Sequence, residues 1–449
     1  MAPQVPNIPW GMLASTLELR PVNPCQNGAF NFHFHNDPDR NRTLTRFRNA
    51  FVRNILNHAM FERSLHPQTY SPPGPNDLVL TDDVAISIEK DIHYWRSDHD
   101  GPFKFGPIRG LKRHKRLCDC QSTCTCPLPL KERKMLAFQR QGRDRSHPMP
   151  CPYSQDQFCF RNRKPFFNLE VIKTLLVHRE LDTLLQISAH PSVDLGYFCN
   201  RVHCNCVNGK LGWDVIFRVA MDVYIMLNVV YCFRETWEQS STPVANYTSL
   251  KVYQQVVCHC TKYCPLSDIP AYPQPKFFGI PKHQFEPNPL PHNRARWQHL
   301  IESEKLRYYP CGLMTYPDFL AFEKPIIYQP RAKDVDFVSK ILHKVGRLPI
   351  ELIDRIFSLA DYTTGRRLVV PHLPFHPDNR AELNHHLDQC WQLIVECAVF
   401  LRAQQPDTED LGAETTETRM SDMVESSVQW LFECPCDTHF ESASDHSGP

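Results

Sequence analysis

Residues 348–360 read LPIELIDRIFSLA and carry the clearest helical pattern in the chain. Pro349 suits the first turn of a helix, where its missing N–H costs nothing. Apolar side chains at helical spacing then occupy one face: Leu352, Ile353, Ile356, Phe357 and Ala360. This pattern predicts an amphipathic helix whose apolar face must be covered by a partner. Periodicity does not tell whether that partner is this chain or another one.

The same segment resembles the opening of the F-box, on the matching residues Leu348, Pro349, Glu351, Leu352, Ile353, Ile356, Phe357 and Leu359. The resemblance implies a substrate receptor of an SCF-type ubiquitin ligase, which would bind a Skp-type adaptor protein and an unknown substrate protein. It implies six partner-binding residues: Leu348, Pro349, Leu352, Ile353, Ile356 and Phe357. Residues 366–380 depart from the family because they carry three prolines, and residues 381–403 could supply the later helix. A core helix that begins with a proline is the alternative interpretation.

Other segments with helical periodicity lie on both sides of this one, at residues 43–65, 166–190, 211–238, 334–345 and 381–403. The most apolar stretch, Val215–Phe233, contains Arg218 and Asp222, so it predicts a buried helix and no membrane span. Alternation over Phe30–His35 predicts a strand. The expected fold class is therefore mainly α with irregular Pro- and Cys-rich segments and a few short strands, with α+β as the alternative.

Shifts in composition divide the chain into four predicted segments. Residues 1–150 form an irregular N-terminal region, and residues 151–333 form a helical Cys-rich domain. Residues 334–403 form the F-box-like helical region. Residues 404–449 are acidic and lack periodicity, which predicts a disordered tail, with a short apolar docking turn at Ser427–Phe432.

The 449-residue chain has a net charge of +1, so no global field favours nucleic acid or a membrane as a partner. Residues 1–20 lack the pattern of a secretion signal, so the cytoplasm or nucleus is expected. Two basic stretches, residues 104–116 and 131–134, resemble a two-part nuclear import signal, and a solvated basic loop is the alternative.

Nineteen cysteines in a chain without a secretion signal favour reduced thiols or metal ligands over disulfides. The candidate zinc ligands form one dense cluster and two sparser ones: Cys118, Cys120, Cys124 and Cys126; Cys199, Cys204 and Cys206; Cys258, Cys260 and Cys264. Thiolates suit structural zinc, although the spacings differ from the usual Cys-x2-Cys pairs. The second functional hypothesis is therefore a zinc-stabilised protein- or nucleic-acid-binding module without a ligase role, and ordinary thiols are the alternative to zinc.

Motifs of the common enzyme classes are missing from the sequence: it has no Gly-rich phosphate loop, no Gly-x-Ser-x-Gly and no His-Glu-x-x-His. A chance cysteine–histidine pair is easy to find in such a chain and needs supporting geometry and a perturbed pKa. The sequence therefore predicts a binding protein that is not an enzyme and needs no certain cofactor.

Overall fold

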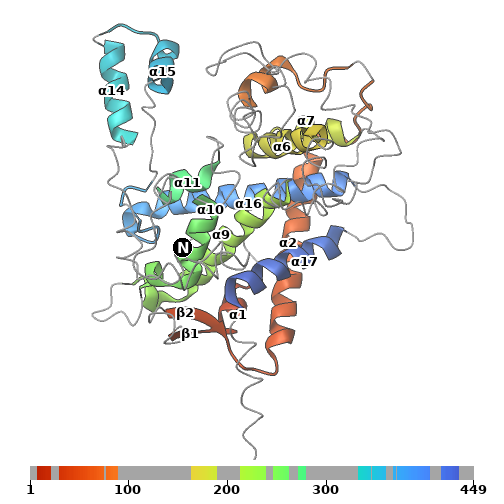
Figure 1. Ribbon diagram of the computed structural model, residues 1–449, viewed down its shortest axis with the longest axis vertical. Helices are drawn as coiled ribbons and strands as arrows, with labels where there is room; N and C mark the ends of the chain where they lie inside the picture. Colours follow the sequence, from red (N-terminus) through yellow and green to blue (C-terminus); the bar gives the residue numbers. More distant parts are fainter. Residues whose placement is uncertain are drawn as a thin grey trace, which may run out of the picture.

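The structure is a computed structural model that describes a large part of the chain: residues 8–21, 30–74, 77–88, 163–189, 213–238, 246–261, 272–279, 332–344, 346–359, 368–370, 372–404 and 416–433. These residues are mainly helical and contain one two-stranded antiparallel sheet (Figure 1). The predicted mainly α fold class is confirmed.

The N-terminal part holds α1 (Trp10–Ala14), β1 (Leu17–Pro21), β2 (Phe30–Phe34) and α2 (Arg40–Ser64). The middle of the chain contributes α6 (Arg163–His178), α7 (Leu181–Ser188), α9 (Asp214–Cys232), α10 (Lys251–Thr261) and α11 (Pro273–Phe278), with 3₁₀ turns η3 (Arg234–Thr236) and η4 (Tyr247–Ser249). The C-terminal part holds α14 (Ala332–Lys344), α15 (Ile350–Leu359), η8 (Pro377–Asn379), α16 (Arg380–Ala403) and α17 (Thr416–Phe432).

The strand predicted at Phe30–His35 is β2, and it pairs with β1 in antiparallel register. Its alternation places Phe32 in the core, where the ring lies 4.4 Å from that of Phe233 at the end of α9. The partner strand β1 falls in a region that was predicted to be irregular, because Leu17–Pro21 is too short and mixed to show a period.

The centre of the molecule is α9, which α16, α10, α17 and α1 all contact. This helix is long and apolar enough to cross a membrane by length and composition, but 83% of its apolar window is buried inside the protein. The prediction of a buried helix at Val215–Phe233 is therefore confirmed. Figure 1 shows α16 and α2 crossing α9, so three long helices form the frame of the fold.

An aromatic cluster joins these helices where they cross. The Tyr224 ring of α9 lies 5.5 Å from Trp10 of α1, 6.2 Å from Phe51 of α2 and 5.5 Å from Trp391 of α16. The Trp391 indole Nε1 also donates a 3.2 Å hydrogen bond to His58 Nδ1 on α2, so its polar edge is satisfied. Offset and edge-to-face ring pairs at these distances add to the free energy gained by burying the rings.

The predicted disordered tail is wrong for residues 416–433, because α17 packs on α2 and α9. Met420, Val424 and Val428 recur every four residues and are buried, followed by Leu431 and Phe432. The acidic side chains on the other faces had obscured this apolar stripe. The short apolar turn predicted at Ser427–Phe432 is the last part of this helix.

One hydrophobic cluster collects residues from α1, α2, α6, α7, α9, α10, α11, α16 and α17. Its contacts cross the boundaries of all four segments drawn from the sequence. Among the described helices, α14 and α15 add nothing to this cluster; they contact each other and stand away from the remaining labelled helices in Figure 1.

Removing one ring from the aromatic cluster should destabilise the whole fold. Phe51 of α2 is fully buried, so we expect Phe51→Ala to lower the free energy of unfolding by ~3–5 kcal/mol. Phe61→Ala on the same helix is the matched control, because the Phe61 side chain is 67% exposed, and it should change stability by no more than ~0.5 kcal/mol. Denaturant unfolding followed by circular dichroism measures both, and equal losses would contradict this description of the core.

Candidate functional site

Residues 348–359 supply the end of the turn and the second helix of a helical hairpin, which consists of α14, α15 and the tight turn between them. The Leu342 carbonyl accepts hydrogen bonds from the N–H groups of Gly346 and Leu348, at 3.1 and 3.3 Å. A Cβ atom at Gly346 would lie 2.8 Å from that carbonyl oxygen, so the turn requires glycine there. Arg347 follows with a φ of 50°, in the left-handed region. The turn thus sets two short helices side by side.

The hairpin covers only part of its apolar surface. Ile353 and Phe357 of α15 are buried, yet neither belongs to the main hydrophobic cluster. The remaining large apolar side chains are open to solvent, at 65% for Phe337, 41% for Ile341, 53% for Ile350, 50% for Leu352 and 40% for Ile356; these five are called the exposed hairpin residues below. The α15 helix therefore buries one apolar stripe and leaves a second one uncovered, and α14 adds the exposed side chains of Phe337 and Ile341.

The structure divides the six predicted partner-binding residues into two groups. Leu352 and Ile356 are exposed, together with Pro349, while Leu348 is half-buried. Ile353 and Phe357 are buried and are unavailable to a partner unless the hairpin opens. Sequence periodicity places Leu352, Ile353, Ile356 and Phe357 on one broad face and could not separate the covered side chains from the exposed ones.

The predicted zinc ligands fall mostly outside the described residues. This applies to Cys118, Cys120, Cys124 and Cys126, to Cys199, Cys204 and Cys206, and to Cys264. Cys258 lies in α10. Cys260 of the same helix is buried in the core, and its thiol donates a 3.3 Å hydrogen bond to the Val257 carbonyl. Among the described residues no group of three or more His, Cys, Asp or Glu side chains is arranged to hold a metal.

A cysteine–histidine pair lies inside the core between α11 and α16. His386 Nε2 lies 3.8 Å from the Cys390 sulfur, and the Gln274 side-chain amide donates to the same sulfur at 3.7 Å. The His386 ring also stacks on Phe277 at 3.8 Å. Burial raises the pKa of the Cys390 thiol, which disfavours the thiolate that a nucleophile needs. This pair is part of the packing and has no access to a substrate.

A polar cluster lies where α2, α7 and α16 meet. Tyr70 donates a 2.6 Å hydrogen bond to Asp182, and His66 Nδ1 lies 2.8 Å from the same carboxylate oxygen. The bond from Tyr70 lowers the pKa of Asp182, while burial and the nearby carboxylate raise the pKa of Tyr70. The cluster ties the end of α2 to the start of α7.

Glu396 of α16 is the most unusual ionisable group beside this cluster. Its carboxylate is 4% exposed and accepts a 3.1 Å hydrogen bond from Arg179 Nε, whose side chain is half exposed. Burial raises the pKa of Glu396 from 4.5 to about 7, although the Arg179 charge acts in the opposite direction. A carboxyl group with this pKa can exchange a proton near neutral pH, but its burial separates it from any substrate in solution.

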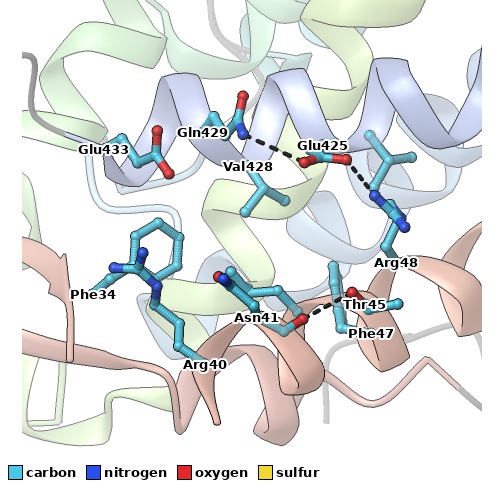
Figure 2. A pocket seen from close by; sticks show the side chains of 12 residues that line it. Phe34, Arg40, Asn41, Thr45, Phe47, Arg48, Glu425, Val428, Gln429 and Glu433 are labelled. Carbon is cyan, nitrogen blue, oxygen red and sulfur yellow. Dashed lines mark hydrogen bonds and ion pairs between the residues drawn. The ribbon is translucent and has the colours of Figure 1, made fainter. Parts of the chain in front are cut away.

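A small pocket lies between the first half of α2 and the second half of α17 (Figure 2). Its volume is about 130 Å³, and its wall combines apolar residues with two arginines and two glutamates: Phe34, Arg40, Asn41, Leu44, Thr45, Phe47, Arg48, Val424, Glu425, Val428, Gln429 and Glu433. Binding sites for drug-sized ligands usually measure ~300–1,000 Å³. This pocket therefore suits only a very small molecule.

Sequence reasoning missed both the polar cluster and the pocket. Glu396 stands alone among apolar residues 393–401, and an isolated carboxylate in such a run was a usable signal for a buried charge. No comparable signal marks the pocket, because Arg40 and Glu433 lie near opposite ends of the chain. Only the packing of α17 on α2 brings them together.

These elements define a helical protein with one aromatic-rich core and an amphipathic hairpin exposed at its side. A family model described as gramillins biosynthetic cluster protein GRA5 matches residues 11–428. Because the match spans most of the chain, this protein belongs to that family. No curated protein and no solved structure matches the chain.

The predicted F-box identity, with its role in a ubiquitin ligase, is therefore wrong. The family match covers nearly the whole chain, whereas the F-box resemblance covered thirteen residues. The structure gives a physical reason: two expected adaptor contacts, Ile353 and Phe357, are buried. In addition, residues 381–403, which could have supplied a later F-box helix, form the core helix α16. A short amphipathic pattern with a leading proline is not specific enough to identify an F-box.

Glu396 should make stability depend on pH. The native carboxyl keeps its proton up to about pH 7, whereas the unfolded one releases it near 4.5, so the native state binds more protons between these values. The free energy of unfolding should therefore fall as pH rises through this window, by of order 3 kcal/mol from this group. The stabilising contribution of Glu396 to the free energy of unfolding is fully present below pH 4.5.

The Glu396→Gln variant should remove most of this fall, because glutamine stays neutral and still offers an oxygen to Arg179. Urea unfolding at several pH values between 4.5 and 7.5 measures the slope. Glu417→Gln on the exposed side of α17 is the control and should keep the wild-type slope. An unchanged slope in Glu396→Gln would refute the assignment.

Proposed function

We propose that this chain is a protein-binding component of a gramillin-type biosynthetic pathway. In this proposal the hairpin docks onto another protein encoded by the same gene cluster, and the chain contributes binding and no catalysis. Membership of a family named for the gramillins biosynthetic cluster supports the pathway. The single observation that supports docking is the set of exposed hairpin residues, which lie apart from the main core.

The exposed apolar area has a physical cost unless something covers it. Five large apolar side chains at 40–65% exposure lie on two helices whose total length is short. Single exposed apolar residues are common on protein surfaces, but a concentration on one small element is typical of interaction sites. Both helices keep an i,i+4 spacing in their exposed pairs, Phe337 with Ile341 and Leu352 with Ile356. Such spacing suits insertion into an apolar groove.

Charge around the hairpin indicates the character of the partner. Lys344, Arg347 and Arg355 are exposed near the turn and on α15, while Lys340 is exposed on α14 and pairs with Asp336 at 3.7 Å. A partner with an apolar groove and an acidic rim would complement this arrangement. Rim charges of this kind mainly raise the rate of association, and salt screens them.

Localisation and thiol chemistry follow as part of the same proposal. Cys232 and Cys390 carry free thiols, which suits a reducing compartment such as the cytoplasm or nucleus. Zinc binding by the cysteine clusters outside the described residues stays a prediction, and elemental analysis of the purified protein would test it.

Replacing exposed apolar residues on α15 should abolish docking without unfolding the chain. We expect Leu352→Ser combined with Ile356→Ser to weaken binding to the partner by ~30-fold or more, since a central anchor typically contributes ~2 kcal/mol or more. Proteins encoded by the same cluster would be purified one by one, and their affinity for the chain measured by biolayer interferometry. Raising the salt concentration should slow association.

The matched control is Met60→Ser combined with Phe61→Ser, because these two apolar side chains are also exposed, at 48% and 67%, but lie at the end of α2. This control should bind like the wild type. If no protein of the cluster binds, or if binding is indifferent to the α15 changes, the docking proposal fails. Binding to lipid vesicles alone would also overturn it.

A further inference from the structure

We propose that the pocket between α2 and α17 binds a free α-amino acid with a short apolar side chain. This inference is independent of the docking proposal, because the pocket and the hairpin share no residue. It follows from three properties of the pocket: the placement of its charges, the chemistry of its floor and its volume.

Two opposite charges face each other at one end of the pocket. Figure 2 shows Arg40 on α2 below and Glu433 just after α17 above, both beside Phe34. The Arg40 guanidinium lies over the Phe34 ring, 5.5 Å from its centroid, which holds the cation at the pocket wall. Within the described part of the chain neither Arg40 nor Glu433 forms an ion pair. A ligand with a carboxylate for Arg40 and an ammonium group for Glu433 would satisfy both.

At the opposite end of the pocket, the charged side chains Arg48 and Glu425 pair with each other. Arg48 Nη1 donates to the Glu425 carboxylate, and Gln429 donates to the other oxygen of Glu425 at 3.5 Å (Figure 2). This end therefore offers no free charge to a ligand. A molecule bound here should carry both of its charges at the Arg40 and Glu433 end, as an α-amino acid does.

The floor between the two ends is apolar. Phe47 of α2 and the pair Val424 and Val428 of α17 are buried and line the pocket, with Leu44 beside them. A short aliphatic side chain would contact this floor and displace water from it. A longer side chain would meet the Arg48–Glu425 pair.

The volume sets the size of the ligand. An engineered apolar cavity of ~150 Å³ in another protein binds benzene, a molecule with six heavy atoms. A pocket of about 130 Å³ therefore suits a ligand of about that size, such as alanine or valine. Tryptophan is too large for it.

The ends of α2 and α17 that border the pocket favour the same placement of the two ligand charges. Asn41 lies in the first turn of α2, at the positive end of the helix dipole, which favours a carboxylate. Glu433 directly follows the last turn of α17, where unpaired carbonyls favour an ammonium group. The dipoles of α2 and α17 thus favour a carboxylate beside Arg40 and an ammonium group beside Glu433, as the charges of these two side chains do.

Titration of the full chain with L-valine, followed by NMR of the ligand and by calorimetry, tests the proposal. We expect saturable binding of L-valine, at least tenfold weaker binding of isobutylamine and isobutyrate, which each lack one charge, and no binding of L-tryptophan. Arg40→Gln and Glu433→Gln should each weaken L-valine binding tenfold or more. Neither change touches the buried core, and thermal unfolding checks that both variants fold.

Matched controls are Arg42→Gln on α2 and Asp422→Asn on α17, which remove exposed charges outside the pocket and should leave the affinity unchanged. Equal binding of isobutylamine and L-valine would overturn the assignment, and so would equal effects of the pocket and control variants. Absence of any binding by L-alanine and L-valine would overturn it as well. These outcomes leave docking by the hairpin untouched, so the two proposals fail separately.

Discussion

The packing of Tyr224 against rings from three other helices is the interaction on which the rest of the structure depends. Trp10, Phe51 and Trp391 reach this ring from α1, α2 and α16, so segments from both ends of the chain meet on α9. With α9 almost completely surrounded, the chain has one continuous core and covers its most apolar segment by itself. The α17 helix then closes the side of α2, and its position creates the pocket between them.

This core explains why the hairpin is a separate element. Because α9 is covered by α1, α10, α16 and α17, the central helix has little surface left for α14 and α15. The hairpin buries Ile353 and Phe357 but keeps Leu352 and Ile356 in solvent, so it is stable enough to form and still has apolar surface to offer. The docking proposal requires this arrangement, in which the main core is complete by itself and an amphipathic hairpin stays exposed. The family model shows membership of the GRA5 family, and under the docking proposal the exposed hairpin would bind another protein of the same cluster.

Much of the fold could be predicted from the sequence where a segment has a strong period of its own. The helices α2, α9, α14, α15 and α16 and the strand β2 all lie where the apolar spacing predicted them. Prediction failed for α17, because its acidic residues dominated the composition although Met420, Val424 and Val428 keep helical spacing. It failed for function because the pattern of residues 348–360 is shared by many amphipathic helices, and the F-box interpretation gave it more meaning than its length supports. The pocket was beyond prediction, because its charged residues come from positions almost four hundred residues apart.

Native-state hydrogen exchange of the free chain, read by mass spectrometry of its peptides, tests the central claim most directly. If the core is complete without the hairpin, the amides of α9 and α16 should exchange only by global unfolding, and those of α14 and α15 should exchange much faster. Addition of the docking partner should then slow exchange in α14 and α15 and leave α9 unchanged. Equal protection of α14, α15 and α9 in the free chain would contradict the claim, because the hairpin would then belong to the core.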